Sequence, residues 1–376
     1  MKLRASQLVG FRQVRHRLHA RAPARAALEV VSGLCGLQAQ VLSCSELMLW
    51  ARVESLPPGF VAKALWEERS LLKTWAMRGT LHLLPSREYG LWQPALSTYR
   101  HYLRPAWLRY CRVTAGELEG LLEAVGMALD ARPHTREELA AAVERATSKR
   151  VARPVRDSWG MALKPASYRG KLCFGPSRGP NVTFLNPRDW LAAVKPDGKP
   201  LAPEPALWEV LRRFFAAHGP ASVAELSRWW GFLGAAGKRA LEPLRDELCE
   251  VEVDGQPAFA LAKDRDELRN AAPVPGVRLL PGFDQYVLVA SVGADRFLPH
   301  ARHRRQVFRN QGWISAVVLV DGRMAGVWRH ERKGKTLKVE VEPFRSLPAR
   351  TRRGVGEEAE RLAAFLGGQD LALRWS

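Results

Sequence analysis

Thr135-Arg136-Glu137-Glu138-Leu139 and Val182-Thr183-Phe184-Leu185 bracket a region whose local signals agree on one supersecondary structure. Thr135 and Glu138 have the spacing of a capping box, in which each side chain satisfies a backbone N–H of the first helical turn. A longer helical stretch near Leu118–Leu129 precedes this box, and a further helical segment follows it. The β-rich segments Lys171–Phe174 and Val182–Leu185 come next, with Gly and Pro between them. The order of three helices and a hairpin predicts a winged helix.

The same order recurs further along the chain. Ser222 and Glu225 form another capping box after a helical stretch at Leu207–Ala217, and the arms Leu248–Val253 and Ala258–Leu261 flank an Asp-Gly turn. This second helix–hairpin arrangement predicts a further winged helix.

The first third of the chain repeats the plan with weaker signals. Helices are predicted at about Ala24–Gly33, from a Ser43-x-x-Glu46 box to Val53, and at Gly59–Glu68, and a hairpin-like stretch follows at Leu71–Leu84. Three tandem winged-helix units are therefore predicted.

The C-terminal third has a different pattern. Val287–Ala290 and Val317–Val320 are apolar, β-rich runs, and Asp321-Gly322 is a strong hairpin turn. Leu337–Val341 alternates apolar and charged residues, as a half-buried strand does, and Glu357–Phe365 is typical of a closing helix. The predicted fold class is α+β, with tandem winged helix-turn-helix domains and a C-terminal β-barrel. The predicted domains cover residues 1–112, 113–195, 201–270 and 275–376.

The charge balance indicates a polyanionic partner. The 376 residues include 58 Lys and Arg against 38 Asp and Glu, a net charge of +20. Such an excess most often accompanies nucleic-acid binding, although an arginine-rich coding bias gives the same count. Apolar residues make up 47% of the chain, as in folded soluble proteins, and we find no apolar run long enough to predict a membrane span.

The N-terminus contains several arginines before its first acidic residue, Glu29. A transit peptide can have this composition. Because Leu8, Phe11 and Leu18 can line one helix face, we instead predict a structural helix whose basic side faces phosphate.

The cysteine spacing and the absence of common catalytic motifs limit the classes of reaction to consider. The five cysteines are scattered without a C-x-x-C pair, which predicts reduced core thiols and no zinc site. P-loop, G-x-S-x-G and H-E-x-x-H motifs do not occur. We therefore predict an activity without metal or cofactor, in the cytoplasm and associated with the nucleoid.

Gln38-Ala39-Gln40 is the most informative polar segment. In an extended backbone, side chains two residues apart point to the same side, whereas in a helix they diverge. Since a predicted helix cap follows at Ser43, we expect the segment before it to be extended. Both amides would then face one cleft. Two polar loop glutamines are the alternative.

Several strings resemble the AlkZ/YcaQ-type winged-helix DNA glycosylases, and the likeness extends over essentially the whole chain. They are Gly36–Gln40, Leu49-Trp50-Ala51-Arg52-Val53, Thr74–Pro85, Leu279-Leu280-Pro281-Gly282-Phe283-Asp284 and Val320–Arg329. Trp75–Pro85 is the most specific of them. The family signature of Gln, a small or aliphatic residue, then Gln or Asp falls on Gln38 and Gln40, which implies the Gln-x-Gln branch. Leu42 departs from the family, where many relatives have Pro.

The resemblance implies removal of N7-alkylated purines and unhooking of interstrand cross-links by hydrolysis of the N-glycosidic bond. Its catalytic residues would be Gln38 and Gln40. An N7-alkylated purine is cationic and leaves as a neutral base, so the protein need only position water. Amides do not titrate near neutrality, which predicts selectivity for cationic lesions and a weak pH dependence. A base joined to the opposite strand cannot swing out freely, so we expect an open cleft.

Candidate DNA contacts form three groups. The first is Arg78 and His82 in the predicted first hairpin, although core packing also explains a histidine in a strand. The second lies in the predicted third helix of the second unit and comprises Ser158, Lys164, Tyr168 and Arg169. The third is a basic patch that also contains His303 and is interleaved with Phe297 and Phe308: Arg302, Arg304, Arg305 and Arg309. A solvated charged loop is the alternative for this patch.

The predicted protein is thus a monofunctional DNA glycosylase that acts, as a monomer, on double-stranded DNA with alkylated or cross-linked purines. A winged-helix transcriptional regulator is the rival interpretation. It explains the charge and the fold class, but it gives no reason for the two glutamines.

Overall fold

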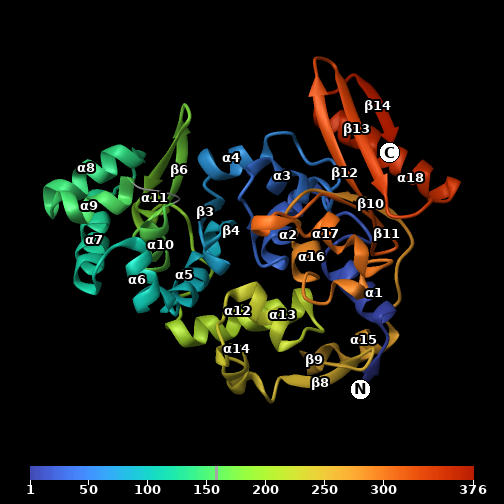
Figure 1. Cartoon of the computed structure of the whole chain (residues 1–376), viewed down its shortest axis with the longest axis horizontal. Helices are drawn as coiled ribbons and strands as arrows, with labels where there is room; N and C mark the ends of the chain where they lie inside the picture. Colours follow the sequence, from blue (N-terminus) through green and yellow to red (C-terminus); the bar gives the residue numbers. More distant parts are fainter. Residues whose placement is uncertain (157–159) are drawn as a thin grey trace. The chain divides into compact units, whose positions relative to one another are not determined.

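The computed structural model describes residues 1–156 and 160–376, and it has a mixed α+β fold with several small sheets (Figure 1). The chain divides into two compact units, one made of residues 61–210 and the other of residues 1–60 and 211–376. Among the described residues, no helix has both the length and the apolar character needed to cross a membrane.

The unit of residues 61–210 contains two hairpins and a set of mostly short helices. Its strands are β3 (Leu71–Trp75), β4 (Leu81–Pro85), β5 (His134–Thr135), β6 (Cys173–Arg178) and β7 (Asn181–Leu185). Its helices are α4 (Phe60–Trp66), α5 (Tyr89–Ser97), α6 (Pro105–Cys111), α7 (Ala115–Ala128), α8 (Arg136–Ala146), α9 (Lys149–Arg156), α10 (Lys164–Tyr168) and α11 (Pro187–Trp190).

Both hairpins predicted in this region are confirmed, and they pack on each other. The Trp75 ring of β3 lies 4.7 Å from the Phe174 ring of β6 and 6.2 Å from the Phe184 ring of β7, measured between centroids. Leu72, Cys173, Leu185 and Trp190 form a buried cluster in the same core. Aromatic and aliphatic burial therefore holds the two hairpins together.

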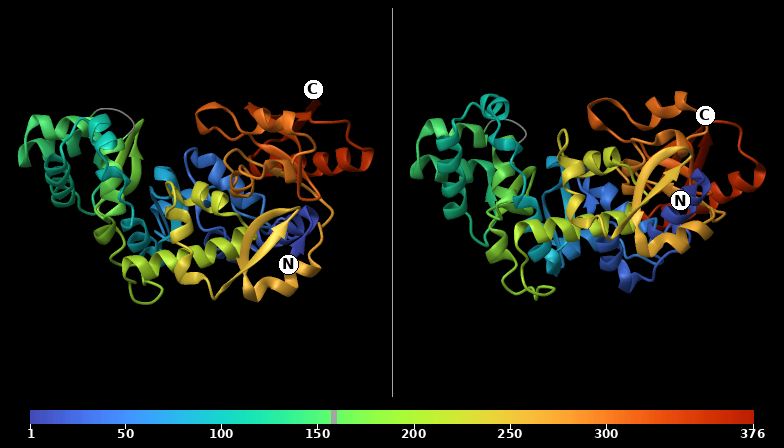
Figure 2. Two further views of the ribbon diagram at one scale, coloured as in Figure 1. Left: turned by 60° about the horizontal axis from the view of Figure 1, so that its bottom comes forward. Right: turned by 90° about the horizontal axis from the view of Figure 1, so that it is seen from below.

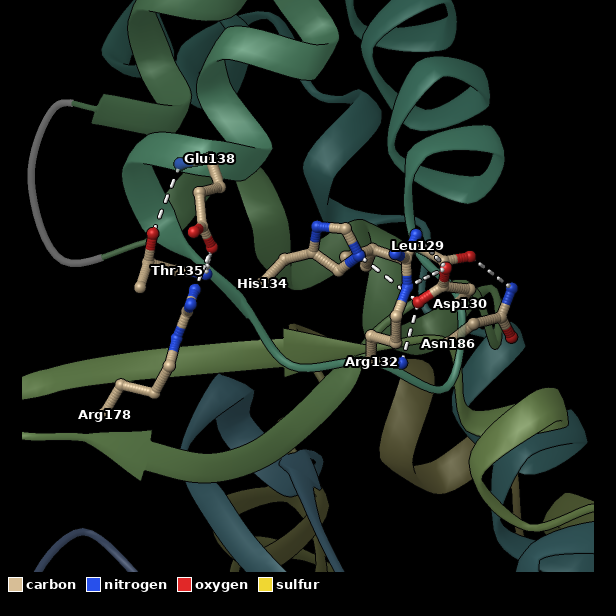
Figure 3. Close-up of polar contacts among 8 residues, drawn as sticks. All are labelled: Leu129, Asp130, Arg132, His134, Thr135, Glu138, Arg178 and Asn186. Carbon is tan, nitrogen blue, oxygen red and sulfur yellow. Dashed lines mark hydrogen bonds and ion pairs between the residues drawn. The ribbon is translucent and has the colours of Figure 1, made fainter.

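The predicted capping box at Thr135 is confirmed and also connects α8 to the second hairpin (Figure 3). The Thr135 hydroxyl accepts from the Glu138 backbone N–H at 3.3 Å, and the Glu138 carboxylate accepts from the Thr135 N–H at 2.7 Å. The same carboxylate binds the Arg178 guanidinium on β6. The boxes predicted at Thr114 and Ser222 are confirmed as well.

The other unit combines the N-terminal segment with the C-terminal half of the chain. Its helices are α1 (Ala5–Arg15), α2 (Ala27–Gly33), α3 (Leu42–Trp50), α13 (Val223–Trp230), α14 (Ala236–Arg239), α15 (Arg265–Asn270), α16 (Gln285–Val289), α17 (Arg304–Val307) and α18 (Ala349–Phe365). Helix α12 (Pro203–His218) spans the boundary between the two units. The strands are β1 (Lys2–Leu3), β2 (Leu37–Gln38), β8 (Leu248–Val253), β9 (Gln256–Leu261), β10 (Val277–Leu280), β11 (Val317–Val320), β12 (Arg323–Lys333), β13 (Thr336–Pro343) and β14 (Asp370–Trp375).

Two sheets organise this unit. Strand β1 pairs in parallel with β8, so the N-terminus lies beside the β8–β9 hairpin (Figure 2). The second sheet has five strands in the order β10-β11-β12-β13-β14, with the parallel β13–β14 pair at one edge and α18 packed against β10 and β14. The predicted turn at Asp321-Gly322 joins β11 to β12, and both residues have positive φ, 50° and 79°.

Two local predictions in this unit are wrong. Val287–Ala290 is not a strand, because Val287–Val289 belongs to helix α16, which Asp284 caps by accepting the Tyr286 backbone N–H at 2.9 Å. A short buried apolar run has no periodicity to separate helix from strand. Ser43 does not cap a helix, since α3 begins one residue earlier at Leu42 and no side chain caps it.

The N-terminal helix α1 is also only partly as predicted. Leu8 and Phe11 on α1, and Leu18 beyond it, are buried, which confirms the apolar face. The expected phosphate-facing basic side is wrong for its central arginine, because Arg12 is 1% exposed and donates to Glu225 at 3.1 Å. Arg15 likewise binds Asp264 and Glu267. Arg12 and Arg15 thus form ion pairs with carboxylates from distant segments of the chain, and these pairs hold α1 to those segments.

Candidate active site

The segment with the two glutamines connects β2 to α3. Gln38 ends the strand and is 5% exposed, Ala39 is fully buried, and Gln40 is exposed. The Ser45 hydroxyl, buried in the first turns of α3, donates to the Gln38 backbone oxygen at 2.9 Å. The helix thereby fixes the backbone of the segment that precedes it, and Gln40 lies at the protein surface.

A buried ion pair lies just beyond the C-terminal end of α3. Arg52 is 0% exposed and donates to both carboxylate oxygens of Asp284, each at 2.7 Å. It also donates to the backbone oxygens of Met48 at 3.0 Å and His16 at 2.9 Å. A bidentate guanidinium–carboxylate pair is geometrically specific, so it sets the position of α3 against the segment that contains Asp284.

The Asp284 segment also contacts the start of α3. A Cβ placed on Gly282 would lie 3.7 Å from the Cys44 Sγ and 3.0 Å from the Ile314 backbone oxygen. Burial, with a smaller contribution from Asp284, raises the pKa of the Cys44 thiol to about 11, so it stays protonated at neutral pH. Cys44 therefore contributes packing here and no nucleophile.

More buried polar groups surround this ion pair. His16 and His218 share a hydrogen bond of 2.9 Å between Nε2 and Nδ1. Burial, and then the charge of Arg12, lowers the pKa of His218 to about 3; burial and the neighbouring His218 lower the pKa of His16 well below its usual value. We call the set Arg12, His16, Arg52, His218, Glu225 and Asp284 the buried polar cluster. Its histidines are neutral near pH 7 and its arginines face carboxylates.

In residues 61–210, three of the predicted DNA contacts come together at the tip of the β3–β4 hairpin. Arg78 has φ of 60° at this tip, and its backbone N–H donates to the Tyr99 hydroxyl at 3.4 Å. A Cβ on the neighbouring Gly79 would lie 2.9 Å from the Tyr168 hydroxyl and 3.3 Å from the Lys164 side chain. Burial lowers the pKa of Lys164 and raises that of Tyr168.

The other predicted contacts in this region have different surroundings. His82 is fully buried on β4, and its Nδ1 lies 3.0 Å from the Thr80 backbone oxygen. Burial and the nearby Arg78 lower the pKa of His82 to about 3, so it is neutral at pH 7. Arg169 donates to Tyr102 at 3.2 Å and to Glu119 at 2.6 Å. Ser158 lies outside the described residues.

The four arginines of the predicted basic patch are all exposed. Arg304 donates to the Ser291 backbone oxygen at 2.6 Å, and Arg302 to the His303 ring at 3.2 Å. Arg309 lines a hollow of about 370 Å³ together with Arg329, Glu340 and Glu342. Within the described part of the chain, Arg302, Arg304, Arg305 and Arg309 have no carboxylate partner, so their charges remain available to an anion.

Sequence reasoning missed some features of these regions. Ser45 was not predicted to anchor the glutamine segment, and Arg52 was not predicted to bind Asp284, although both segments carry the family resemblance. A hollow of about 690 Å³ in residues 61–210, lined by Arg109, Arg112, Arg150 and Arg153, was missed as well. No periodic signal separates these arginines from others in an arginine-rich chain.

No group of three or more His, Cys, Asp or Glu side chains is placed to hold a metal ion in residues 1–156 and 160–376. None of the five cysteines, all of which lie in the described residues, forms a disulfide, and three of them are buried.

Comparisons with known proteins agree on one family. Residues 31–365 match the sequence profile of the family described as DNA glycosylase AlkZ-like. An interstrand DNA cross-link repair glycosylase from Streptomyces sahachiroi is 36% identical over 381 residues, which covers 100% of both chains. The solved structure of the Streptomyces sahachiroi DNA glycosylase AlkZ superposes with a TM-score of 0.88 and 35% identity, again over 100% of each chain.

Proposed function

Since the chain belongs to the AlkZ-like DNA glycosylase family, we propose that it excises N7-alkylated purines, with Gln38 and Gln40 orienting the attacking water. The family acts on N-glycosidic bonds, and the protein is therefore a hydrolase.

The chemistry suits a pair of uncharged amides. An alkyl group on N7 makes the purine cationic, so the base departs neutral and needs no proton from a general acid. A glutamine carbonyl accepts a hydrogen bond from water, and its NH₂ group donates to phosphate, sugar or the other amide. Positioning and fixed dipoles must then supply the rate.

The observation that carries this proposal is the way the glutamine segment is held. Its backbone is anchored through Ser45, and α3 is bound through Arg52 to Asp284. Two of the segments that carry the family resemblance in this unit, those with Arg52 and Asp284, are thus joined by a buried ion pair. Gln40 lies at the exposed end of this framework and Gln38 at its buried end, an arrangement that suits a water held between solvent and protein.

We extend the proposal to cross-linked DNA. The Streptomyces sahachiroi relative is named for interstrand cross-link repair, and its 36% identity spans the entire chain. We propose that this protein also unhooks purine–purine cross-links. Because neither base of a cross-link can leave the duplex freely, the damaged base would be attacked without full extrusion.

The finer fold and the DNA contacts belong to the same proposal. The three helix–hairpin arrangements would be tandem winged helices in residues 1–112, 113–195 and 201–270, and residues 275–376 a β-barrel with its closing helix. Contacts to phosphate or to the lesion would come from Arg78 and His82, and contacts to the DNA groove from Ser158, Lys164, Tyr168 and Arg169. Contacts to the DNA backbone would come from the basic patch of Arg302, Arg304, Arg305 and Arg309. The protein would act as a monomer at the nucleoid.

Release of free base from duplex DNA containing N7-methylguanine tests the proposal. The double variant Gln38→Ala, Gln40→Ala should lose about 10²-fold or more in single-turnover rate, as removal of preorganised polar groups does elsewhere. Its affinity for the duplex should be retained. Because amides do not titrate, the wild-type rate should be nearly constant from about pH 7 to 9.

Gln256→Ala is a matched control, since this glutamine is exposed in the same unit at the start of β9. Unchanged base release in the double variant would refute the glutamine mechanism while leaving the family assignment intact. Strict preference for single adducts over a defined cross-link would refute the unhooking proposal alone.

A further inference from the structure

Trp313 is a large aromatic side chain that the protein covers only in part. It is 49% exposed, and it lies in the exposed turn of residues 309–313, which begins at the last arginine of the basic patch. A single exposed hydrophobic side chain is ordinary on a protein surface, so the exposure of this indole gains meaning only from the groups around it.

The turn that holds Trp313 is closed and well defined. The Arg309 backbone N–H donates to the Trp313 oxygen at 2.8 Å, and the Trp313 N–H donates to the Asn310 oxygen at 3.2 Å. Gln311 and Gly312 have φ values of 58° and 77°, in the left-handed region that permits a tight reversal. Phe308 and Ile314 form a bridge beneath the turn. Little conformational entropy would be lost when the indole meets a ligand.

Trp313 is attached to the framework of the candidate active site. Its ring packs edge-on against Phe283, with centroids 4.9 Å apart and planes at 69°. Phe283 is 3% exposed and precedes Asp284, the partner of Arg52. The Ile314 oxygen and the Cys44 Sγ both approach Gly282, at 3.0 and 3.7 Å from a built Cβ. Cys44 follows Gln40 by four positions, so the turn and the glutamine segment share one support.

The charges around the turn indicate the chemistry of the partner. Arg305 and Arg309 are exposed, and an exposed flat indole beside cations suits a nucleic acid, whose bases stack while its phosphates bind arginine. Resting on the proposed glycosylase function, we propose that Trp313 stacks on a nucleobase next to the lesion and holds the damaged strand against Gln38 and Gln40. It is a positioning residue, because the hydrolysis itself does not require it.

Trp313→Ala, Trp313→Phe and Leu233→Ala test this role. Leu233 is a matched control, because its side chain is also 49% exposed in the same unit. Single-turnover release of N7-methylguanine should fall roughly tenfold or more in Trp313→Ala, as loss of one base–aromatic stack does elsewhere. Trp313→Phe should restore most of the rate, and Leu233→Ala should match wild type.

A binding measurement separates this role from catalysis. The duplex carries 2-aminopurine beside the lesion, and each substitution is placed in the Gln38→Ala, Gln40→Ala background so that the lesion persists. Binding should change the 2-aminopurine emission in the parent and with Leu233→Ala, and should leave it as in free DNA with Trp313→Ala. Equal emission changes in all three proteins would overturn the stacking proposal.

Two further outcomes are decisive. If Trp313→Ala lowers both the rate and the melting temperature and Trp313→Phe restores neither, the indole is structural and the proposal fails. If wild type releases no N7-methylguanine but Trp313 still controls the 2-aminopurine signal, the stacking role stands and the proposed excision activity fails.

Discussion

Arg52 and Arg305 belong to the same unit, yet their surroundings have opposite character. Arg52 is 0% exposed, donates to both oxygens of Asp284 and to two backbone oxygens, and joins α3 to the start of α16. Arg305 is exposed on α17 in a patch of four arginines without carboxylate partners among the described residues.

The comparison separates structural cations from cations that can bind DNA. A buried guanidinium without a partner is strongly destabilising, so each one must be matched by a carboxylate or backbone oxygens. An exposed guanidinium keeps its hydration and contributes mainly when phosphate displaces counterions. The net charge of +20 therefore overstates how many N-terminal arginines can bind DNA, because Arg12 and Arg15 form ion pairs with acidic side chains.

The largest expected effect is the loss of the Arg52–Asp284 pair. Arg52→Met should lower the free energy of unfolding by about 3–5 kcal/mol, because it leaves the Asp284 carboxylate buried and uncompensated. Urea denaturation followed by circular dichroism measures the change.

Asp284→Leu and the double variant complete a double-mutant cycle. The double variant should be less destabilised than the sum of the single ones, since no lone charge remains buried. Additive single effects would show that the two charges act independently, against the geometry of the pair.

The next effect is an acid dependence from His82. Its folded pKa is about 3, below the usual value of 6.5, so the unfolded chain binds a proton that the folded protein does not. This contribution is fully present above pH 6.5 and is lost as pH falls from 6.5 toward 3, at about 1.4 kcal/mol per pH unit.

His82→Asn should remove that contribution from the slope. Unfolding free energy measured in urea at several pH values between 4.5 and 6 compares the two proteins. If the variant and the wild type had the same slope, the His82 ring would be exposed in the folded protein rather than buried. The proposed DNA contact of His82 requires the imidazole to become accessible when DNA binds.

A smaller effect is expected from the hydroxyl that holds the glutamine segment. Ser45→Ala should destabilise the protein by about 1–2 kcal/mol, because the buried hydrogen bond from the Ser45 hydroxyl to the Gln38 carbonyl is removed. Base release should slow as well if the backbone of this segment positions the amides.

Ser43→Ala is the control for that prediction, since Ser43 is exposed and caps no helix. Its unfolding free energy should stay within about 0.5 kcal/mol of wild type. Equal losses in the two variants would contradict the specific role of Ser45.

The smallest effect on stability is expected for Arg305, the exposed arginine of this comparison. Arg305→Ala should change the unfolding free energy by less than about 0.5 kcal/mol. It should lower the slope of log affinity against log salt concentration by about 0.9, the value for one lost phosphate contact on duplex DNA. Fluorescence polarisation at several salt concentrations measures this slope.

Arg245→Ala provides the contrast, because Arg245 is exposed but lies 3.6 Å from Asp246. Its removal should leave the salt slope unchanged. If both variants lower the slope equally, the basic patch has no special part in binding.

The sequence alone determined the locally encoded parts of this protein. The capping boxes at Thr114, Thr135 and Ser222, the hairpins β3–β4 and β6–β7, and the Asp321-Gly322 turn depend on residues close together in the chain. Backbone sterics and short-range hydrogen bonds determine these features, so the local sequence is enough to predict them. The glutamine pair was also identifiable, because the resemblance is carried by contiguous residues.

Only the tertiary structure decided which polar groups are buried and with what partner. The sequence does not distinguish the surroundings of three arginines that differ in the structure. Arg12 pairs with Glu225, Arg52 pairs with Asp284, and Arg305 is exposed to solvent. These partners lie more than two hundred positions apart, and Val287–Val289 became helical because Asp284 caps it while pairing with Arg52. The energy of a charge depends on its desolvation and its neighbours, and both are set by the packing of distant segments rather than by local sequence.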